Sequence, residues 1–378
     1  MDGVSGPSGG VAAGARVGGG GDELGRFRRL SDLTAVAILL LVVIGGIVRV
    51  SESGLGCGPA GSGTEGWPLC GGAVIPLVGD ESRLIEFSHR VLAAIVGVMI
   101  AVLVWRALRM RRPQTSPNLR QLRWPLRGAI AAGVLVLVQA ALGGLTVENN
   151  LEDELVAAHL GLAMLLLGLI LWLSVRARQE QAAALPAGTS PVQARSSRRL
   201  GFVRDAPVRG LKPFAVGAVG LLLCAIVAGG YVAGTEEEGV TGGAANGAHL
   251  ACGESFPTCL DGRLLPFGES RLTDIHLTHR VFVYAATAAI LALLGLALAR
   301  GSRSRLLLAA ALLLVAQLLL GALNVWLGEH AALVVAHLTV ATLLWSSVLL
   351  IAYRLAWAPA PAAARPPAGR TEAVAVAR

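Results

Sequence analysis

The stretch RLIEFSHRVLAAIVG, from Arg83 to Gly97, indicates what kind of fold this chain needs, because ionisable residues open a segment that then becomes wholly apolar. Glu86, His89 and Arg90 stand close together at its start. Ionisable side chains on a helix apolar enough for a membrane are costly, so their presence usually marks function. The stretch therefore predicts a membrane helix that carries chemistry near one end.

The composition of the whole chain is that of an α-helical integral membrane protein. Its 378 residues are 54% hydrophobic and only 15% charged. The apolar residues form long blocks of helix formers instead of the alternating pattern of β-barrel strands. Eight blocks of roughly 18 to 25 residues are each long enough to cross about 30 Å of hydrocarbon. The blocks centre near Leu41, Val96, Leu135, Leu166, Leu222, Ala288, Leu314 and Leu344.

The second half of the chain repeats patterns of the first. FSHRV (87–91) matches LTHRV (277–281), QAALGGLTV (139–147) matches QLLLGALNV (317–325), and LVAAHLGLAMLLL (155–167) matches LVVAHLTVATLLW (333–345). An even number of crossings separates the halves, so both have the same orientation. We predict eight transmembrane helices arranged as two tandem four-helix bundles, related by a pseudo-twofold axis along the membrane normal.

Composition also sets the predicted domain boundaries. Residues 33–176 form the N-terminal bundle, residues 213–357 form the C-terminal bundle, and a basic linker at 177–212 joins them. The tails at 1–32 and 358–378 are expected to be disordered, because they lack hydrophobic periodicity. No cleavable signal peptide is expected, since the first apolar run is too long and begins too far into the chain.

The charges between the apolar blocks predict the orientation. Arginines concentrate before the first block and after the second, fourth, sixth and eighth blocks, whereas Asp and Glu dominate the other connections. The positive-inside rule therefore predicts a multi-pass protein of the cell membrane with both termini in the cytoplasm. This topology explains the formal charge of +8. A nucleic-acid partner is not expected, because the chain has no folded basic domain that could bind one.

Four histidines occupy equivalent places in the two halves: His89, His159, His279 and His337. Each follows the outer start of its helix by a few residues, which predicts a depth of about 6 to 12 Å. Two histidines per bundle at matched depth can clamp a planar metal cofactor, and haem suits paired imidazoles. Hydrogen-bonded helix contacts are the alternative, but helix packing alone does not require duplicated histidines. Zinc fits poorly, since the second half has no further ligands at that depth.

Three arginines are predicted at the same outer level. Arg90 and Arg280 directly follow histidines, and Arg49 ends the first apolar block. Their predicted partners are the anionic propionates of haem. Snorkelling of the side chains to the interface is the alternative. The repeated His-Arg dipeptide favours the propionates.

Four of the five cysteines lie in the two large outer loops. Cys57 and Cys70 share the first loop, and Cys252 and Cys259 share the second, which predicts one disulfide per loop. Free thiols are the alternative. A disulfide near a haem can be structural or redox-active, and the spacing does not separate these roles. Cys224 lies within the fifth block and is expected to be a small buried apolar residue.

The halves differ beside the first histidine of each pair. Glu86 precedes His89 by three residues, whereas His276 holds the equivalent place before His279. A carboxylate beside a haem can exchange protons while a bound substrate is oxidised, although pairing with Arg90 is an alternative role. We therefore place catalysis in the first half and an auxiliary, electron-relaying haem in the second. His249 and His330 are expected to be solvated loop residues, and the role of His276 stays open.

Several motifs together resemble the landmarks of a known family. SGLGC, WPLC, EFSHR, GGLTV, LVAAHL, HLTHR and VVAHLTVATLLW occur in the same order as in heme A synthases of the bacterial Cys-pair type, over roughly residues 33–353. The resemblance implies oxidation of the C8 methyl of heme O to the formyl of heme A, for use in aa3-type terminal oxidases. It also implies a bound heme b and supply of heme O by a heme O synthase.

The resemblance also implies roles for single residues. His89 and His159 would hold the substrate haem, and His279 and His337 would ligate heme b. Glu86 would be the catalytic carboxylate, and Cys57 with Cys70 would be the functional cysteine pair. The Gly-rich insertion GPAGSGTEG between those two cysteines departs from the family pattern, because relatives are often shorter there.

A di-haem b-type electron carrier linked to quinol is the alternative function. It would pass electrons without modifying either haem, and it explains the four histidines and the arginines equally well. It does not explain why Glu86 lacks a counterpart, nor the paired cysteines. No motif in the chain identifies the electron donor or acceptor for either function.

Overall fold

A computed structural model describes residues 19–76, 80–112, 121–183, 208, 210–235, 247–328 and 330–356. Within these ranges the regular structure is helical, and eight helices are long and apolar enough to cross a membrane. The predicted fold class, an all-α membrane protein with eight spans, is therefore confirmed. The predicted C-terminal tail, residues 1–18 of the N-terminal tail and residues 184–207 of the linker lie outside the described part of the chain.

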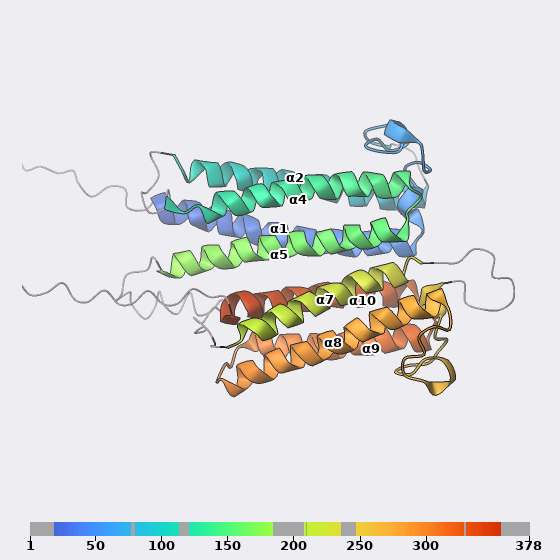
Figure 1. Ribbon diagram of the computed structural model, residues 1–378. Helices are drawn as coiled ribbons and strands as arrows, with labels where there is room; N and C mark the ends of the chain where they lie inside the picture. Colours follow the sequence, from blue (N-terminus) through green and yellow to red (C-terminus); the bar gives the residue numbers. More distant parts are fainter. Residues whose placement is uncertain are drawn as a thin grey trace, which may run out of the picture.

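The eight helices fall into two sets of four along the chain (Figure 1). The first set is α1 Gly19–Val50, α2 Glu81–Arg109, α4 Trp124–Glu148 and α5 Asp153–Ala183. The second set is α7 Lys212–Val232, α8 Arg271–Ala299, α9 Arg305–Trp326 and α10 Ala331–Ile351, which continues as a π-turn at Ala352–Ala356.

Helix contacts follow the same pattern in both sets. In the first set α1 contacts α2 and α5, and α4 contacts the same two helices. In the second set α7 contacts α8 and α10, and α9 contacts the same two. Between the sets α1 meets α10, α5 meets α7, and α5 meets α10. Equivalent helices thus make equivalent contacts, and the pseudo-twofold axis along the membrane normal stays a prediction.

Matching N-caps fix the register of the two helices that carry the His-Arg dipeptide. The side chain of Asp80 accepts a hydrogen bond from the first turn of α2, and Ser270 does the same for α8. Such caps satisfy backbone N–H groups that have no partner inside the helix. Asp80 precedes His89 by as many residues as Ser270 precedes His279. The two histidines therefore enter their bundles at the same height above the helix start.

The first helix begins earlier than the sequence analysis expects. Residues 19–32 were assigned to a disordered tail, but α1 already starts at Gly19. Phe27 is fully buried and meets Trp124 of α4 edge to face, with ring centroids 6.2 Å apart. Arg178 of α5 also donates to Asp32 over 2.6 Å. Burial of Phe27 and this ion pair stabilise a helical turn that polar, Gly-rich sequence alone does not predict.

Hydrogen bonds also join the two sets of helices. The indole N–H of Trp345 on α10 donates to the carbonyl of Met164 on α5 over 3.0 Å. The hydroxyl of Tyr353 donates to the carbonyl of Gly168 over 3.1 Å. Both bonds cross from α10 or its π-turn to α5, so they hold the two halves together at the centre of the molecule.

Candidate functional site

The four predicted histidines lie on the helices that start at one end of the molecule. We call this the disulfide end, because the loops at 51–76 and 247–270 lie there, on the right of Figure 1. His89 is on α2, His159 on α5, His279 on α8 and His337 on α10. Each is near the start of its helix. The equivalent placement in the two halves follows from the matching helix starts.

The histidines interact in pairs within each half. His159 is within electrostatic range of His89, and His337 is within range of His279. Each half thus brings two imidazoles together from non-consecutive helices. Two imidazoles per half form the donor set that a haem iron accepts on its two faces. Ligation by these residues remains a prediction.

Buried polar atoms without partners test whether a haem fits here. Among the described residues, the Nδ1 atoms of His159 and His337 are buried and make no hydrogen bond. The Oε1 atoms of Gln139 and Gln317 are in the same condition. Unpaired buried polar atoms are costly, so several of them around two imidazole pairs indicate that something else occupies this space. The residues present therefore fit a haem in each half.

Glu86 is buried in a network that ties helix α2 to the first loop. One carboxylate oxygen accepts a hydrogen bond from the backbone N–H of Cys57 over 2.7 Å. The other accepts from Arg90, whose Nε lies 3.0 Å away and whose Nη2 also contacts it. Only 4% of Glu86 is exposed. The carboxylate is therefore held against the residue that begins the first disulfide.

Arg90 continues this network into the same loop. Its Nη1 donates to the carbonyls of Gly66 and Leu69, over 2.6 and 2.8 Å. Charge-assisted hydrogen bonds of this kind are stronger than neutral ones. Arg90 therefore fastens the loop residues just before Cys70 to helix α2.

The second half uses the equivalent arginine in the same way. Arg280 is 3% exposed, and its Nη1 donates to the carbonyl of Thr258 over 2.6 Å. Its Nη2 donates to the carbonyl of Ser255 over 2.9 Å. The residue in the place of Glu86 is His276, whose Nδ1 lies 2.8 Å from the carbonyl of Ala248. The second half thus keeps the loop contact and replaces the carboxylate.

The two disulfide-containing loops repeat each other, in addition to the repeat of the helices. EGWPLC (65–70) corresponds to ESFPTC (254–259), and both contain a cis X-Pro bond. Arg90 and Arg280 bind carbonyls at equivalent positions of these segments. The signal was the Pro-x-Cys spacing, which recurs at the end of each loop. The repeat therefore extends from the helices into both loops.

Both predicted disulfides are present. Cys57 bonds to Cys70, with an S–S distance of 2.00 Å, and Cys252 bonds to Cys259 at 2.08 Å. All four residues are buried. The expectation for Cys224 is wrong, because this residue is exposed on α7. On a membrane helix an outward face meets lipid instead of water, so an apolar thiol need not be buried in protein.

The three arginines predicted to bind propionates have protein partners. Arg90 and Arg280 donate to loop carbonyls, as described above. Arg49 donates to the carbonyls of Ala233 and Gly234, each 3.3 Å away, at the end of α7 in the other half. Arg49 therefore links the two halves at the disulfide end. A contact with propionates stays a prediction for all three.

Two glutamines beside the histidines were not singled out from the sequence. The Nε2 atom of Gln317 on α9 lies 3.0 Å from Nε2 of His337. Gln139 on α4 donates to the backbone carbonyl of His159 over 2.9 Å. The sequence contains a signal for these two glutamines, because each is the first residue of a repeated segment, QAALGGLTV or QLLLGALNV. A polar residue at one place in both halves marks a shared site.

The other three histidines, His249, His276 and His330, lie outside the pairs. His249 is in the short helical turn Ala248–Leu250 of the second loop, and His330 is exposed at the start of α10. The open question about His276 is partly answered, since it contacts the backbone of that same turn.

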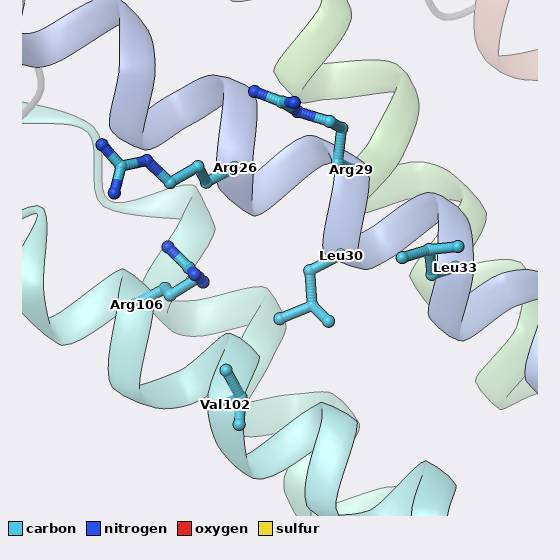
Figure 2. Close-up of a pocket in the computed structure, with 6 residues that line it drawn as sticks. All are labelled: Arg26, Arg29, Leu30, Leu33, Val102 and Arg106. Atoms are coloured by element: carbon cyan, nitrogen blue, oxygen red, sulfur yellow. The ribbon is translucent and has the colours of Figure 1, made fainter.

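A groove at the opposite end of the molecule has a different character (Figure 2). Arg26, Arg29 and Arg106 surround it, above an apolar floor of Leu30, Leu33 and Val102. Arg26 and Arg106 both form ion pairs with Glu23, at 3.7 and 3.6 Å. Among the residues that the structure describes, no histidine or cysteine lines this groove, so the candidate site for haem chemistry is at the disulfide end.

The fold is that of a polytopic α-helical membrane protein, and its paired histidines are the kind of donor set that haem proteins use. The chain belongs to the cytochrome oxidase assembly protein family, COX15-CtaA, whose sequence model matches residues 78–349, more than half of the chain. The resemblance stated from the motifs is thus confirmed at the level of the family.

Known relatives carry the name heme A synthase. The one from Alkalihalophilus pseudofirmus is 26% identical over 257 residues, which cover 68% of this chain and 71% of that protein. The one from Halalkalibacterium halodurans is 27% identical and covers 66% of this chain and 68% of that protein. The one from Shouchella clausii is 34% identical, but the match spans 37% of this chain and 42% of the relative. These names give no support to the electron-carrier alternative.

Proposed function

We propose that this chain is a heme A synthase, an enzyme that oxidises the C8 methyl of heme O to the formyl of heme A. Membership of the family and the names of the relatives support this activity. The observation that carries the proposal is an asymmetry between the halves. Glu86 is buried beside a disulfide in the first half, and His276 takes its place in the second.

In this proposal the first half holds the substrate. His89 and His159 would hold heme O through its iron. Anchoring the substrate through its iron fixes the orientation of the macrocycle edge relative to the protein, and such positioning lowers the barrier to a reaction. The disulfide-containing loop covers the start of α2, so it also limits access of water to that edge.

Glu86 is the proton-exchanging group in this proposal. In the net reaction, a methyl and one water give a formyl, four protons and four electrons, and the electrons pass to an acceptor outside this chain. A positioned carboxylate can accept protons released from the reacting carbon or its oxygen. The hydrogen bonds from Cys57 and Arg90 hold the carboxylate in one orientation. Arg90 also balances the negative charge of this buried group, which would otherwise be costly to desolvate.

The second half is proposed to bind heme b as a resident cofactor. His279 and His337 would hold it, and it would supply one-electron redox chemistry. His276 and Arg280 keep the second loop closed over the start of α8 through bonds to backbone carbonyls. The second half therefore holds a haem without a carboxylate beside the first ligand.

The proposed location is the cell membrane, with both termini in the cytoplasm. Arg26, Arg29 and Arg106 lie at the end of the molecule opposite the disulfides. Disulfides form in oxidising compartments, which supports an outward-facing disulfide end. Heme O is an apolar substrate made by another enzyme, so a heme O synthase in the same membrane is the proposed supplier.

Chromatography of extracted haems tests the activity. Cells that make heme O and express this chain are expected to accumulate heme A. Glu86→Gln should lower the heme A yield by about 100-fold while bound haem is retained, since removal of a positioned acid-base group typically costs that much. Glu81→Gln, an exposed residue of the same helix, is the matched control and should leave the yield unchanged.

Two results would contradict the proposal. If the chain binds haem but converts no heme O, the activity is wrong. If Glu86→Gln makes heme A at the rate of the unmodified chain, the catalytic assignment is wrong even though the activity stands.

A further inference from the structure

A glycine of the neighbouring helix lies against each of the four histidine rings. The pairs are Gly45 with His89, Gly143 with His159, Gly229 with His279, and Gly321 with His337. A Cβ built on these glycines would lie 3.2, 3.1, 2.8 and 3.1 Å, respectively, from Cε1 of the ring. The arrangement recurs on α1, α4, α7 and α9, which are the helices that carry none of the paired histidines.

All four distances are tighter than an ordinary Cβ contact, and the distance at Gly229 is the tightest of them. Ordinary contacts of a Cβ atom lie between 3.4 and 4 Å, and contacts below 3.0 Å force a neighbour to move. Alanine at Gly229 would therefore displace the ring of His279 or spread α7 and α8. Close packing is not a general need for glycine on α7, because a Cβ at Gly217 or Gly220 would meet no other described atom within 4 Å.

Close approach to α7 also gives the ring of His279 a hydrogen bond to the backbone. Nδ1 of His279 lies 3.0 Å from the carbonyl oxygen of Ala225, which is one helical turn before Gly229 on the same helix. A carbonyl only accepts, so Nδ1 carries the proton and the lone pair is on Nε2. Histidines that bind metals commonly donate the other ring N–H to a carbonyl or carboxylate, which fixes the tautomer and the ring plane.

On α1 and α7, adjacent glycines show that the role is specific to the first position of a Gly-Gly pair. Gly46 and Gly230 follow Gly45 and Gly229, but a Cβ at either would meet a leucine of the other half. That Cβ would lie 2.7 Å from Leu338 at Gly46 and 2.9 Å from Leu160 at Gly230. The second glycine of each pair therefore serves the packing of the two halves. The first serves a histidine ring.

We propose that Gly45, Gly143, Gly229 and Gly321 are positioning residues that set the ring orientation of the haem-ligating histidines by letting each imidazole pack directly against the neighbouring helix. The inference rests on the proposed binding of haem by these histidines. These glycines would thus contribute to haem binding although none of them is an iron ligand.

Gly229→Ala is the sharpest test, with Gly220→Ala as the matched control on the same helix. We expect Gly229→Ala to weaken retention of the haem in the second half by about 10-fold, as substitutions behind a metal ligand typically do. The haem that remains should show a shifted low-spin electron paramagnetic resonance signal, because that signal reports the orientation of the axial rings. Gly220→Ala should match the unmodified chain in both measurements.

Gly230→Ala separates ring positioning from helix packing. It should lower the thermal stability of the protein and leave the resonance signal unchanged. If Gly229→Ala does not fold, Gly45→Ala and Gly321→Ala replace it, because their closest contacts of 3.2 and 3.1 Å are milder.

A resonance signal and haem content unchanged in Gly229→Ala would overturn the inference, as would equal shifts in Gly229→Ala and Gly220→Ala. The proposed function fails by a different result, namely an unmodified chain that retains no haem or makes no heme A.

Discussion

Helix α2 of the first half and helix α8 of the second share their scaffold and differ in the buried ionisable side chain that precedes the first histidine. Both begin with a capping residue, both place a histidine at the same height, and both use the next arginine to bind the carbonyls of a disulfide-containing loop. The side chains that differ are Glu86 on α2 and His276 on α8, and each lies between the capping residue and the histidine of its helix. The scaffold for holding a haem is thus separable from the group proposed to do chemistry.

The contacts of these two side chains explain how one scaffold can hold either. Glu86 accepts a hydrogen bond from the N–H of Cys57, whereas His276 contacts the carbonyl of Ala248 through Nδ1. A carboxylate needs donors and an imidazole N–H needs an acceptor, so each loop offers the backbone group that its partner requires. Each loop therefore matches the side chain that it contacts, Glu86 in the first half and His276 in the second.

The largest expected effect comes from removing one histidine of either pair. His279→Ala should abolish the absorbance of the haem in the second half and leave binding of heme O in the first half measurable. His89→Ala should do the reverse. Quantifying each haem after purification checks this, and loss of both haems from either variant would show that the halves are not independent sites.

A smaller effect is expected from removing the loop-binding arginines, and it should differ between the halves. Arg90→Ala should lower the free energy of unfolding by about 4 kcal/mol, because it leaves the buried charge of Glu86 unpaired. Arg280→Ala removes hydrogen bonds to carbonyls and a cation–π contact with Phe256, leaves no buried carboxylate unpaired, and should cost about 2 kcal/mol. Unfolding in detergent measures both values.

The double variant Arg90→Ala with Glu86→Gln provides the control for this comparison. Neutralising Glu86 should recover part of the stability that Arg90→Ala loses. Equal losses for Arg90→Ala and Arg280→Ala would mean that the carboxylate contributes no special cost to the first half.

The smallest effect is expected in the second loop. Replacing Cys252 and Cys259 by serine opens a short loop, which should cost about 2 kcal/mol of stability and little of the heme A yield. The same change at Cys57 and Cys70 also disturbs the residue whose N–H holds Glu86, so it should lower the yield. Haem chromatography of the two double variants checks the difference, and equal yields would contradict it.

The amino-acid sequence by itself determined the features that depend on local pattern. Eight apolar blocks predict eight membrane helices because length and hydrophobicity are properties of each segment alone. The repeated motifs predict that His89 and His279 are equivalent, since equal spacing from a capped start gives equal height. The cysteine pairs follow from short spacing within single loops.

Only the tertiary structure decided the contacts that depend on where distant segments meet. That Arg90 binds carbonyls of the first loop, that Glu86 reaches the N–H of Cys57, and that Gly229 seats His279 all require loop and helix positions that no local pattern encodes. The start of α1 also depends on a tertiary contact, because burial of Phe27 against Trp124 extends the helix into a segment whose composition predicts a tail. Spacing along the chain fixes what each segment can form, whereas packing between segments decides which polar groups find partners.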